Sequence, residues 1–149
     1  MQRNQNKSER GHALLEFALG WTVLWMLFSG VYQFGYSFYT YNALGTSVAN
    51  AAELGSKLDY DTANTAAFAS ALQNMVVYGD KTAGSKPLIP GLSTSNVNVQ
   101  VTLDSNSMPH DVSVSLSSYT IDTIFKTFTL TNKPRATVLY MGRVVCSTC

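Results

Sequence analysis

The chain has 149 residues, of which 46% are hydrophobic and only 13% are charged. This length is typical of one domain, and the charged fraction is about half of the roughly 25% found in soluble domains. The formal net charge of +1 argues against a nucleic-acid-binding protein, and two cysteines are too few for a disulfide framework or a Cys-only zinc site. Composition therefore favours a protein that associates with a membrane.

A polar leader, residues 1–11, carries Arg3, Lys7 and Arg10 and precedes a long apolar run. Residues 17–52 contain no Asp, Glu, Lys or Arg, and residues 13–32 supply the roughly 20 apolar residues that span a bilayer core of about 30 Å. Because only Lys57 follows within a short distance, the positive-inside rule places the N-terminus in the cytoplasm. We predict a single-pass protein of the cell (inner) membrane whose C-terminal domain is periplasmic or extracellular.

The sequence predicts one continuous helix over residues 12–57, about 69 Å long at 1.5 Å per residue and transmembrane in its first half only. An aromatic cluster typical of the membrane–water boundary follows the apolar run, and beyond it small residues recur every four positions on one helical face. Such a stripe predicts close packing against the chain's own domain or a neighbouring subunit. The cluster is Tyr32, Tyr36, Phe38, Tyr39 and Tyr41, and the stripe is Ala43, Ser47, Ala51 and Gly55.

Glu16 is the one carboxylate inside the predicted helix before its last turns. An acid near a helix N-terminus is favoured by the helix dipole and can stay wet at the inner face of the membrane. Alternatively, a carboxylate that faces other helices at that depth marks a functional position. Both interpretations of Glu16 stay open at this point.

The stretch RGHALLEF, residues 10–17, resembles a class III-type prepilin signal, with a basic leader, Gly11 before the cleaved bond and Glu16 at the fifth mature position. A peptidase of this type cuts on the cytoplasmic side of the apolar run, which is retained. An ordinary signal-peptidase site would be Ala49-Asn50-Ala51, but that site lies too far from the N-terminus.

The chain resembles the TadE-like family of minor pilins from the tight-adherence (Flp) pilus. The family pattern G-x-A-x-x-E-[FY]-A is matched by GHALLEFA at residues 11–18, and [EQ]-[FG]-G-x-x-x-[YF] by QFGYSFY at residues 33–39. The Ala/Gly-rich continuation is ANAAELG at residues 49–55. His12 replaces the Phe of many type IV pilins, so N-methylation is not assumed. Gln33 stands where many members have Glu, which puts a charge-based role of that position in doubt.

The resemblance implies that a prepilin peptidase cleaves between Gly11 and His12, and that the product is a minor pilin-like structural subunit that takes part in pilus assembly. The implied partners are other pilin or pseudopilin subunits, an inner-membrane assembly platform and the lipid bilayer; no nucleic acid, cofactor, metal or catalysis is expected. Two alternatives stay open: a major repeating subunit of a pilus or secretion pseudopilus, and a membrane-anchored binding domain or adhesin with an uncleaved N-terminus.

Cleavage would create an α-amine at His12, with an ordinary pKa of about 7.7–8.0. In a bundle of helices this cation pairs with Glu16, next to Phe17, in the same chain or in a neighbour. Because an unpaired charge there would cost several kcal/mol, Glu16 is expected to set the axial register of the assembled helices.

Residues 58–149 are expected to form an exported α+β domain with one helix and a roughly three-stranded antiparallel sheet. Asp61-Thr62 would cap a helix that runs to about Val77 and stops at Gly79. Alternating valines at residues 97–103 and 112–116 predict an antiparallel hairpin. Residues 121–128 are expected to form a short helix on the sheet, and residues 135–145 a third strand.

No catalytic set with convincing spacing is present. His110 with Asp104 or Asp111 is interpreted as a solvated turn, and Asp59 with Asp61 as a wet loop beside a helix cap. The terminal Cys146 and Cys149 would close a local disulfide, bridge two subunits or stay free. A redox site is not expected, because the first cysteine follows a strand rather than beginning a helix.

Overall fold

The first element is a long helix, α1 (Gln5–Lys57), of 53 residues. The computed structural model describes residues 5–123 and 127–145, with side chains from residue 11 onward. The helix begins at Gln5 rather than at the predicted His12, because the Gln, Lys, Glu and Arg residues of the leader are all good helix formers. The chain divides into two compact units, Met1–Ser37 and Phe38–Cys149, and each is described by itself.

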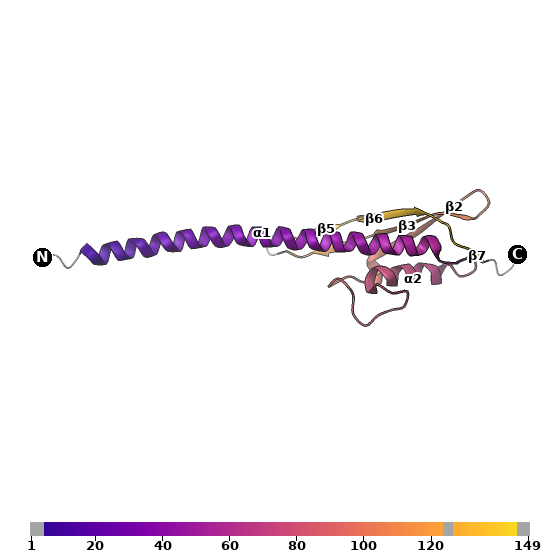
Figure 1. Ribbon diagram of the computed structural model, residues 1–149, viewed down its shortest axis with the longest axis horizontal. Helices are drawn as coiled ribbons and strands as arrows, with labels where there is room; N and C mark the ends of the chain where they lie inside the picture. Colours follow the sequence, from indigo (N-terminus) through magenta and orange to yellow (C-terminus); the bar gives the residue numbers. More distant parts are fainter. Residues whose placement is uncertain (1–4, 124–126, 146–149) are drawn as a thin grey trace. The chain divides into compact units, whose positions relative to one another are not determined.

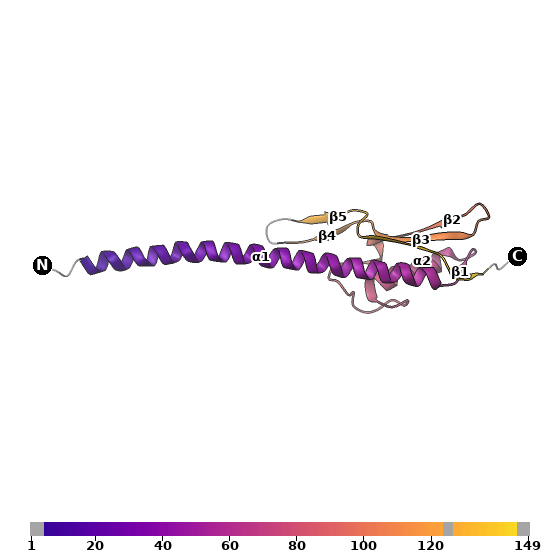
Figure 2. The same ribbon diagram turned by 45° about the horizontal axis from the view of Figure 1, so that its top comes forward.

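The second unit, called the head below, contains residues 38–57 of α1 and all the remaining elements. Two helices precede the main strands along the chain, which confirms the predicted α+β class (Figures 1 and 2). The elements after α1 are β1 (Tyr60–Asp61), α2 (Thr65–Tyr78), η1 (Thr94–Asn96), β2 (Val97–Leu103), β3 (Pro109–Leu116), β4 (Tyr119–Ile121), β5 (Phe128–Leu130), β6 (Arg135–Leu139) and β7 (Val144–Val145).

Helix α2 has a different N-cap from the predicted one. The side chain of Asn64 accepts a hydrogen bond from the Ala67 amide at 3.2 Å and caps the helix. Asp61 lies in β1, and its carboxylate accepts a hydrogen bond from the Ala63 amide at 2.9 Å. Asn and Asp are comparably good caps, so the local composition does not decide between them. The helix stops at Gly79, as predicted, because its φ of 76° suits glycine.

The main sheet has the order β2-β3-β6 and is antiparallel, which confirms the predicted hairpin and its third strand. Val114 lies at its centre and pairs with Val99 on one side and Ala136 on the other. The third strand ends at Leu139 instead of continuing to residue 145. The chain turns there, and β7 pairs in parallel with β1.

The helix predicted over residues 121–128 is wrong. The described residues on both sides form a second hairpin, in which Tyr119 of β4 pairs with Leu130 of β5 and Ile121 pairs with Phe128. Threonines and aromatic residues are frequent in this part of the sequence, and such side chains favour strands over helices. Residues 124–126 lie outside the described residues.

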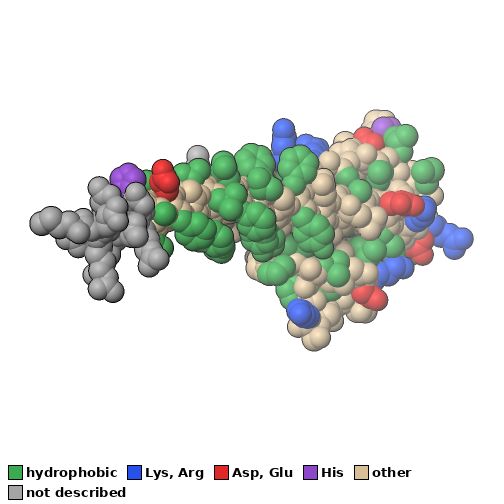
Figure 3. Space-filling model, turned by 60° about the vertical axis from the view of Figure 1, so that its left-hand side comes forward, with side chains coloured by type: hydrophobic (Ala, Val, Ile, Leu, Met, Phe, Trp, Pro, Cys, Tyr) green, Lys and Arg blue, Asp and Glu red, His purple; other side chains and the backbone are tan. Residues whose placement is uncertain are grey.

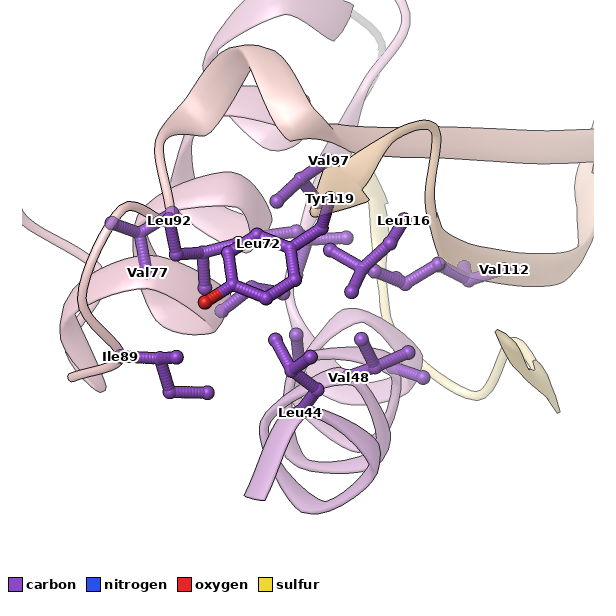
Figure 4. Close-up of a cluster of buried hydrophobic side chains, with 14 of the residues drawn as sticks. Leu44, Val48, Leu72, Val77, Ile89, Leu92, Val97, Val112, Leu116 and Tyr119 are labelled. Atoms are coloured by element: carbon purple, nitrogen blue, oxygen red, sulfur yellow. The ribbon is translucent and has the colours of Figure 1, made fainter. Parts of the chain in front are cut away.

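The core of the head lies between α1, α2 and the inner face of the sheet (Figure 4). Leu44 and Val48 from α1 contribute to it, together with Leu72 from α2 and Val112 and Leu116 from β3, and each of these side chains is at most 1% exposed. Every buried hydrophobic side chain of the described residues belongs to the Phe38–Cys149 unit. The head therefore has a complete core of its own.

Candidate assembly helix

The N-terminal segment of α1, residues 11–37, exposes its hydrophobic side chains. Every side chain from residue 11 to residue 28 is exposed, including Trp25 at 65% and Phe28 at 70%. Figure 3 shows hydrophobic side chains covering the visible face of this segment. The helix is long and apolar enough to cross a membrane. So large an exposed apolar surface suggests that this segment anchors the protein in a membrane.

The bond predicted to be cleaved lies on this exposed surface. Gly11 and His12 are both helical and exposed. A Cβ atom added at Gly11 would meet nothing within 4 Å. The described part of the chain therefore places no steric demand on glycine at this position.

Glu16 and Phe17, predicted to act in helix register, are both exposed. The ring of Phe17 stacks on that of Trp21 one turn later, with the centroids 6.1 Å apart. No ion pair of Glu16 is recorded among the described side chains. Its carboxylate is therefore open to a group supplied from outside this part of the chain.

Several glycines of α1 have open space where a side chain would be. A Cβ atom added at Gly20, Gly30, Gly35 or Gly45 would meet nothing within 4 Å. A glycine inside a helix costs up to about 1 kcal/mol relative to alanine. Among the described residues, no close contact offsets that cost at these four positions.

The predicted stripe of small residues reaches the core at its C-terminal end. Ala51 and Gly55 are buried in the head, whereas Ala43 and Ser47 are half-buried. A Cβ atom at Gly55 would lie 2.9 Å from side-chain carbons of both Leu72 and Val112. Glycine at this position therefore lets α1 approach α2 and the sheet closely.

Of the polar groups considered for catalysis, His110 and Asp111 lie in β3 rather than in the predicted turn, because the strand begins at Pro109. Asp104 lies in the connection between β2 and β3. His110 Nδ1 and Asp111 Oδ2 are 2.8 Å apart on the surface. Asp104 Oδ1 accepts hydrogen bonds from the amides of Met108 and Asn106, and these bonds lower the pKa of Asp104. Within the described residues, no three His, Cys, Asp or Glu side chains gather to hold a metal. Cys146 and Cys149 lie outside the described residues.

Two side chains have roles that sequence reasoning missed. The Tyr140 hydroxyl lies 2.9 Å from the carbonyl oxygens of both Leu58 and Arg143, and burial raises the pKa of Tyr140. No local pattern signals these contacts, because they depend on how distant segments meet. Gln33 Oε1 is buried without a hydrogen-bond partner among the described residues. In the sequence, only its position in the family pattern had drawn attention to Gln33.

The described chain thus consists of an exposed apolar helical segment and a small α+β head. Residues 11–53 match the model of a family described as TadE-like protein. This match lies wholly within α1 and supports a TadE-like, pilin-type protein of the Tad pilus system. The TadE-like family is a structural, pilin-type family. No curated protein and no solved structure matches the chain.

Proposed function

We propose that this protein is a minor pilin-like structural subunit that takes part in assembly of a Tad-type pilus. Its leader is cleaved by a prepilin peptidase between Gly11 and His12, and its N-terminal segment then joins the helices of other pilin or pseudopilin subunits at an inner-membrane assembly platform. The basic leader faces the cytoplasm, and the head lies on the opposite side of the membrane.

The observation that carries this proposal is the contrast in packing within one chain. The head buries a complete core, whereas residues 11–28 bury none of their side chains. A lipid bilayer alone would satisfy these apolar side chains. It gives no reason, however, for the open glycines at positions 20, 30 and 35. Close approach of neighbouring helices gives such glycines a use, because small residues let two backbones come near each other.

The intact mass of the protein extracted from membranes tests the cleavage. A mature chain that starts at His12 supports the proposal, and a chain that starts at Met1 overturns it in favour of an uncleaved anchor. Gly11→Val is the matching variant, because the space around Gly11 is open and the chain itself offers no clash. We expect Gly11→Val to fold and insert normally while cleavage is lost, since the added side chain obstructs the peptidase.

Glu16→Gln tests the register role of the carboxylate. We expect normal cleavage and insertion, and a loss of assembled pili of at least about tenfold, because the cationic amine at His12 loses its charged partner. Pili sheared from cells and quantified by immunoblot provide the measurement.

Glu53→Gln is the matched control for the register role. Glu53 is an exposed acid on the same helix that pairs with Lys57 at 2.7 Å within its own chain. Assembly at the normal level in Glu16→Gln would refute the register role alone. Equal losses in the two variants would refute it as well.

A further inference from the structure

The two outer strands of the main sheet, β2 and β6, each have one edge that is not paired with another strand of the described chain. Backbone groups on an unpaired edge are a template for another strand, and most soluble proteins protect such edges with charges, prolines or bulges. The hydrogen bonds around the sheet show which backbone groups face outward.

On β2, the outward residues are Val99 and Val101. The Ser117 amide donates to the Asn96 carbonyl oxygen at 2.8 Å, whereas the Val97 carbonyl oxygen accepts from the Gln73 side chain at 3.2 Å on the other side. Because antiparallel strands alternate the direction of their backbone groups, even-numbered residues face β3 and odd-numbered residues face away. The usable edge ends at the irregularity between Thr102 and Leu103.

On β6, the outward residues are Arg135, Thr137 and Leu139. The Tyr140 amide donates to the His110 carbonyl oxygen at 2.8 Å, which sets the even-numbered residues toward β3. The free edge ends at Met141, whose amide donates to the Ser56 carbonyl oxygen at 2.8 Å. The structure records no partner for the outward backbone groups of these residues within the described chain.

The usable part of the β2 edge carries none of this protection, and the β6 edge carries one charged residue, Arg135. Strand β2 contains no charged residue and no proline. On β6, the guanidinium Nε of Arg135 and the hydroxyl of Thr137 both donate to Ser113 Oγ, at 2.8 and 3.1 Å. These two side chains therefore lean across the sheet toward β3 and leave the outer edge of β6 open.

We propose that the heads of two copies of this chain associate edge to edge, with β6 of one copy paired to β2 of the next. Such a junction joins two different edges, so every copy keeps one free edge at each end and can add a further copy. It also places half-buried Val99 and Val101 of one copy beside half-buried Ala136 and Val138 of the other, which continues the apolar inner face of the sheet.

A second copy fits these edges better than a foreign extended peptide. A peptide strand would pair with the backbone groups of one edge only. Copies of the head would pair with both, because the β6 edge of one copy uses the β2 edge of the next. Anchoring in one membrane also raises the local concentration of copies, so a small contact area suffices. Since β2 and β6 are each antiparallel to β3, they run in the same direction, and heads presented in the same sense pair as parallel strands.

Cysteine cross-linking of the full chain in its membrane tests this junction. Gln100 and Thr137 are exposed, and both lie opposite Ser113 on the two outer strands. Within one head they are two strand spacings apart, roughly 9–10 Å, which exceeds the Cα separation of about 7 Å that a disulfide tolerates. A disulfide between Gln100→Cys and Thr137→Cys therefore joins two copies.

The parent for all variants carries Cys146→Ser and Cys149→Ser. We expect Gln100→Cys/Thr137→Cys, or a neighbouring pair with Asn98→Cys or Thr102→Cys in place of Gln100→Cys, to give a ladder of dimers and larger species under oxidation. The control is Ser85→Cys/Thr137→Cys, with one cysteine in the exposed loop after α2. We expect its yield of cross-linked species to be at least about fivefold lower. Circular dichroism verifies that each variant folds.

A yield equal to the control in all three pairs would overturn the proposal. An equal yield of dimer from Gln100→Cys alone would also overturn it, because a single cysteine per chain can form only one disulfide and that disulfide would join two β2 edges. The ladder is measured in membranes before and after leader removal. The edge-to-edge proposal is therefore tested by the ladder, and the proposed pilin function is tested separately by the mature N-terminus.

Discussion

Helix α1 contains two segments of similar regularity and opposite environment. In residues 38–57 the side chains that face the head are buried, and Leu44, Ala51 and Ala52 are all 0% exposed. In residues 11–28 every side chain is exposed. Gly55 has no room for a side chain because it faces the core, whereas Gly20 in the first segment and Gly45 in the second both have open space. Hydrophobic residues therefore stabilise the fold in one segment and are available to membrane and partners in the other.

Leu44→Ala should produce the largest effect on the stability of the head. It removes a fully buried side chain and should cost about 2–5 kcal/mol of unfolding free energy. The matched control, Leu24→Ala, makes the same change at a side chain that is 59% exposed and should cost less than about 0.5 kcal/mol. Denaturant unfolding in detergent micelles, followed by the tyrosine signal of the head, measures both. Equal losses of unfolding free energy in the two variants would contradict the division of α1 into a buried and an exposed segment.

Gly55→Val should produce the next largest effect. Its side chain would collide with Leu72 and Val112, so we expect a loss of about 1–3 kcal/mol of unfolding free energy. Gly45→Val introduces the same β-branched residue where nothing lies within 4 Å. We expect that control to leave the thermal midpoint of the head nearly unchanged. A larger loss at Gly45 than at Gly55 would contradict the packing of α1 described above.

Acid should loosen the β2–β3 turn. The amides of Met108 and Asn106 lower the folded-state pKa of Asp104. Its contribution to stability is therefore complete above the unfolded pKa of about 3.9 and is lost as pH falls through the lowered folded value. NMR chemical shifts of the Asn106 and Met108 amides between pH 6 and pH 2 measure this change. In Asp104→Asn the same shifts should no longer follow the titration of a carboxyl group.

A chain that begins at residue 38 should show almost no change in head stability. All buried hydrophobic side chains of the described residues are retained in it. We expect its unfolding free energy to agree with that of the full chain within about 0.5 kcal/mol, and we expect it to lose membrane association. Circular dichroism and flotation with vesicles measure the two properties. A truncated chain that does not fold would show that the head depends on the N-terminal segment.

The sequence was informative wherever the signal was local. Alternating valines predicted β2 and β3, and Gly79 marked the end of α2 because a left-handed C-cap favours glycine. The family resemblance was confirmed over residues 11–53, where the apolar run and the glutamate motif lie close together in the sequence. These features need only nearby residues.

The errors arose where distant segments decide the structure. In the pairing of β1 with β7, Tyr60 lies opposite Val144. Each of these strands has only two residues, which is too short for a sequence pattern that would predict its partner. The predicted helix at residues 121–128 was wrong because so short a stretch of mixed polar and apolar residues does not distinguish a helix from a strand by periodicity alone. The β4–β5 pairing, with Ile121 opposite Phe128, decides for the strand.

The pairing of β1 with β7 also constrains when the head can fold. Tyr60 donates its amide to the carbonyl of Arg143, and Gly142 comes so near Leu58 that an added Cβ atom would lie 2.6 Å from the Leu58 oxygen. The C-terminal end of α1 is thus held by residues far along the chain. The head therefore cannot close until Gly142 and Arg143 have been synthesised, and its folding depends on contacts between distant parts of the sequence.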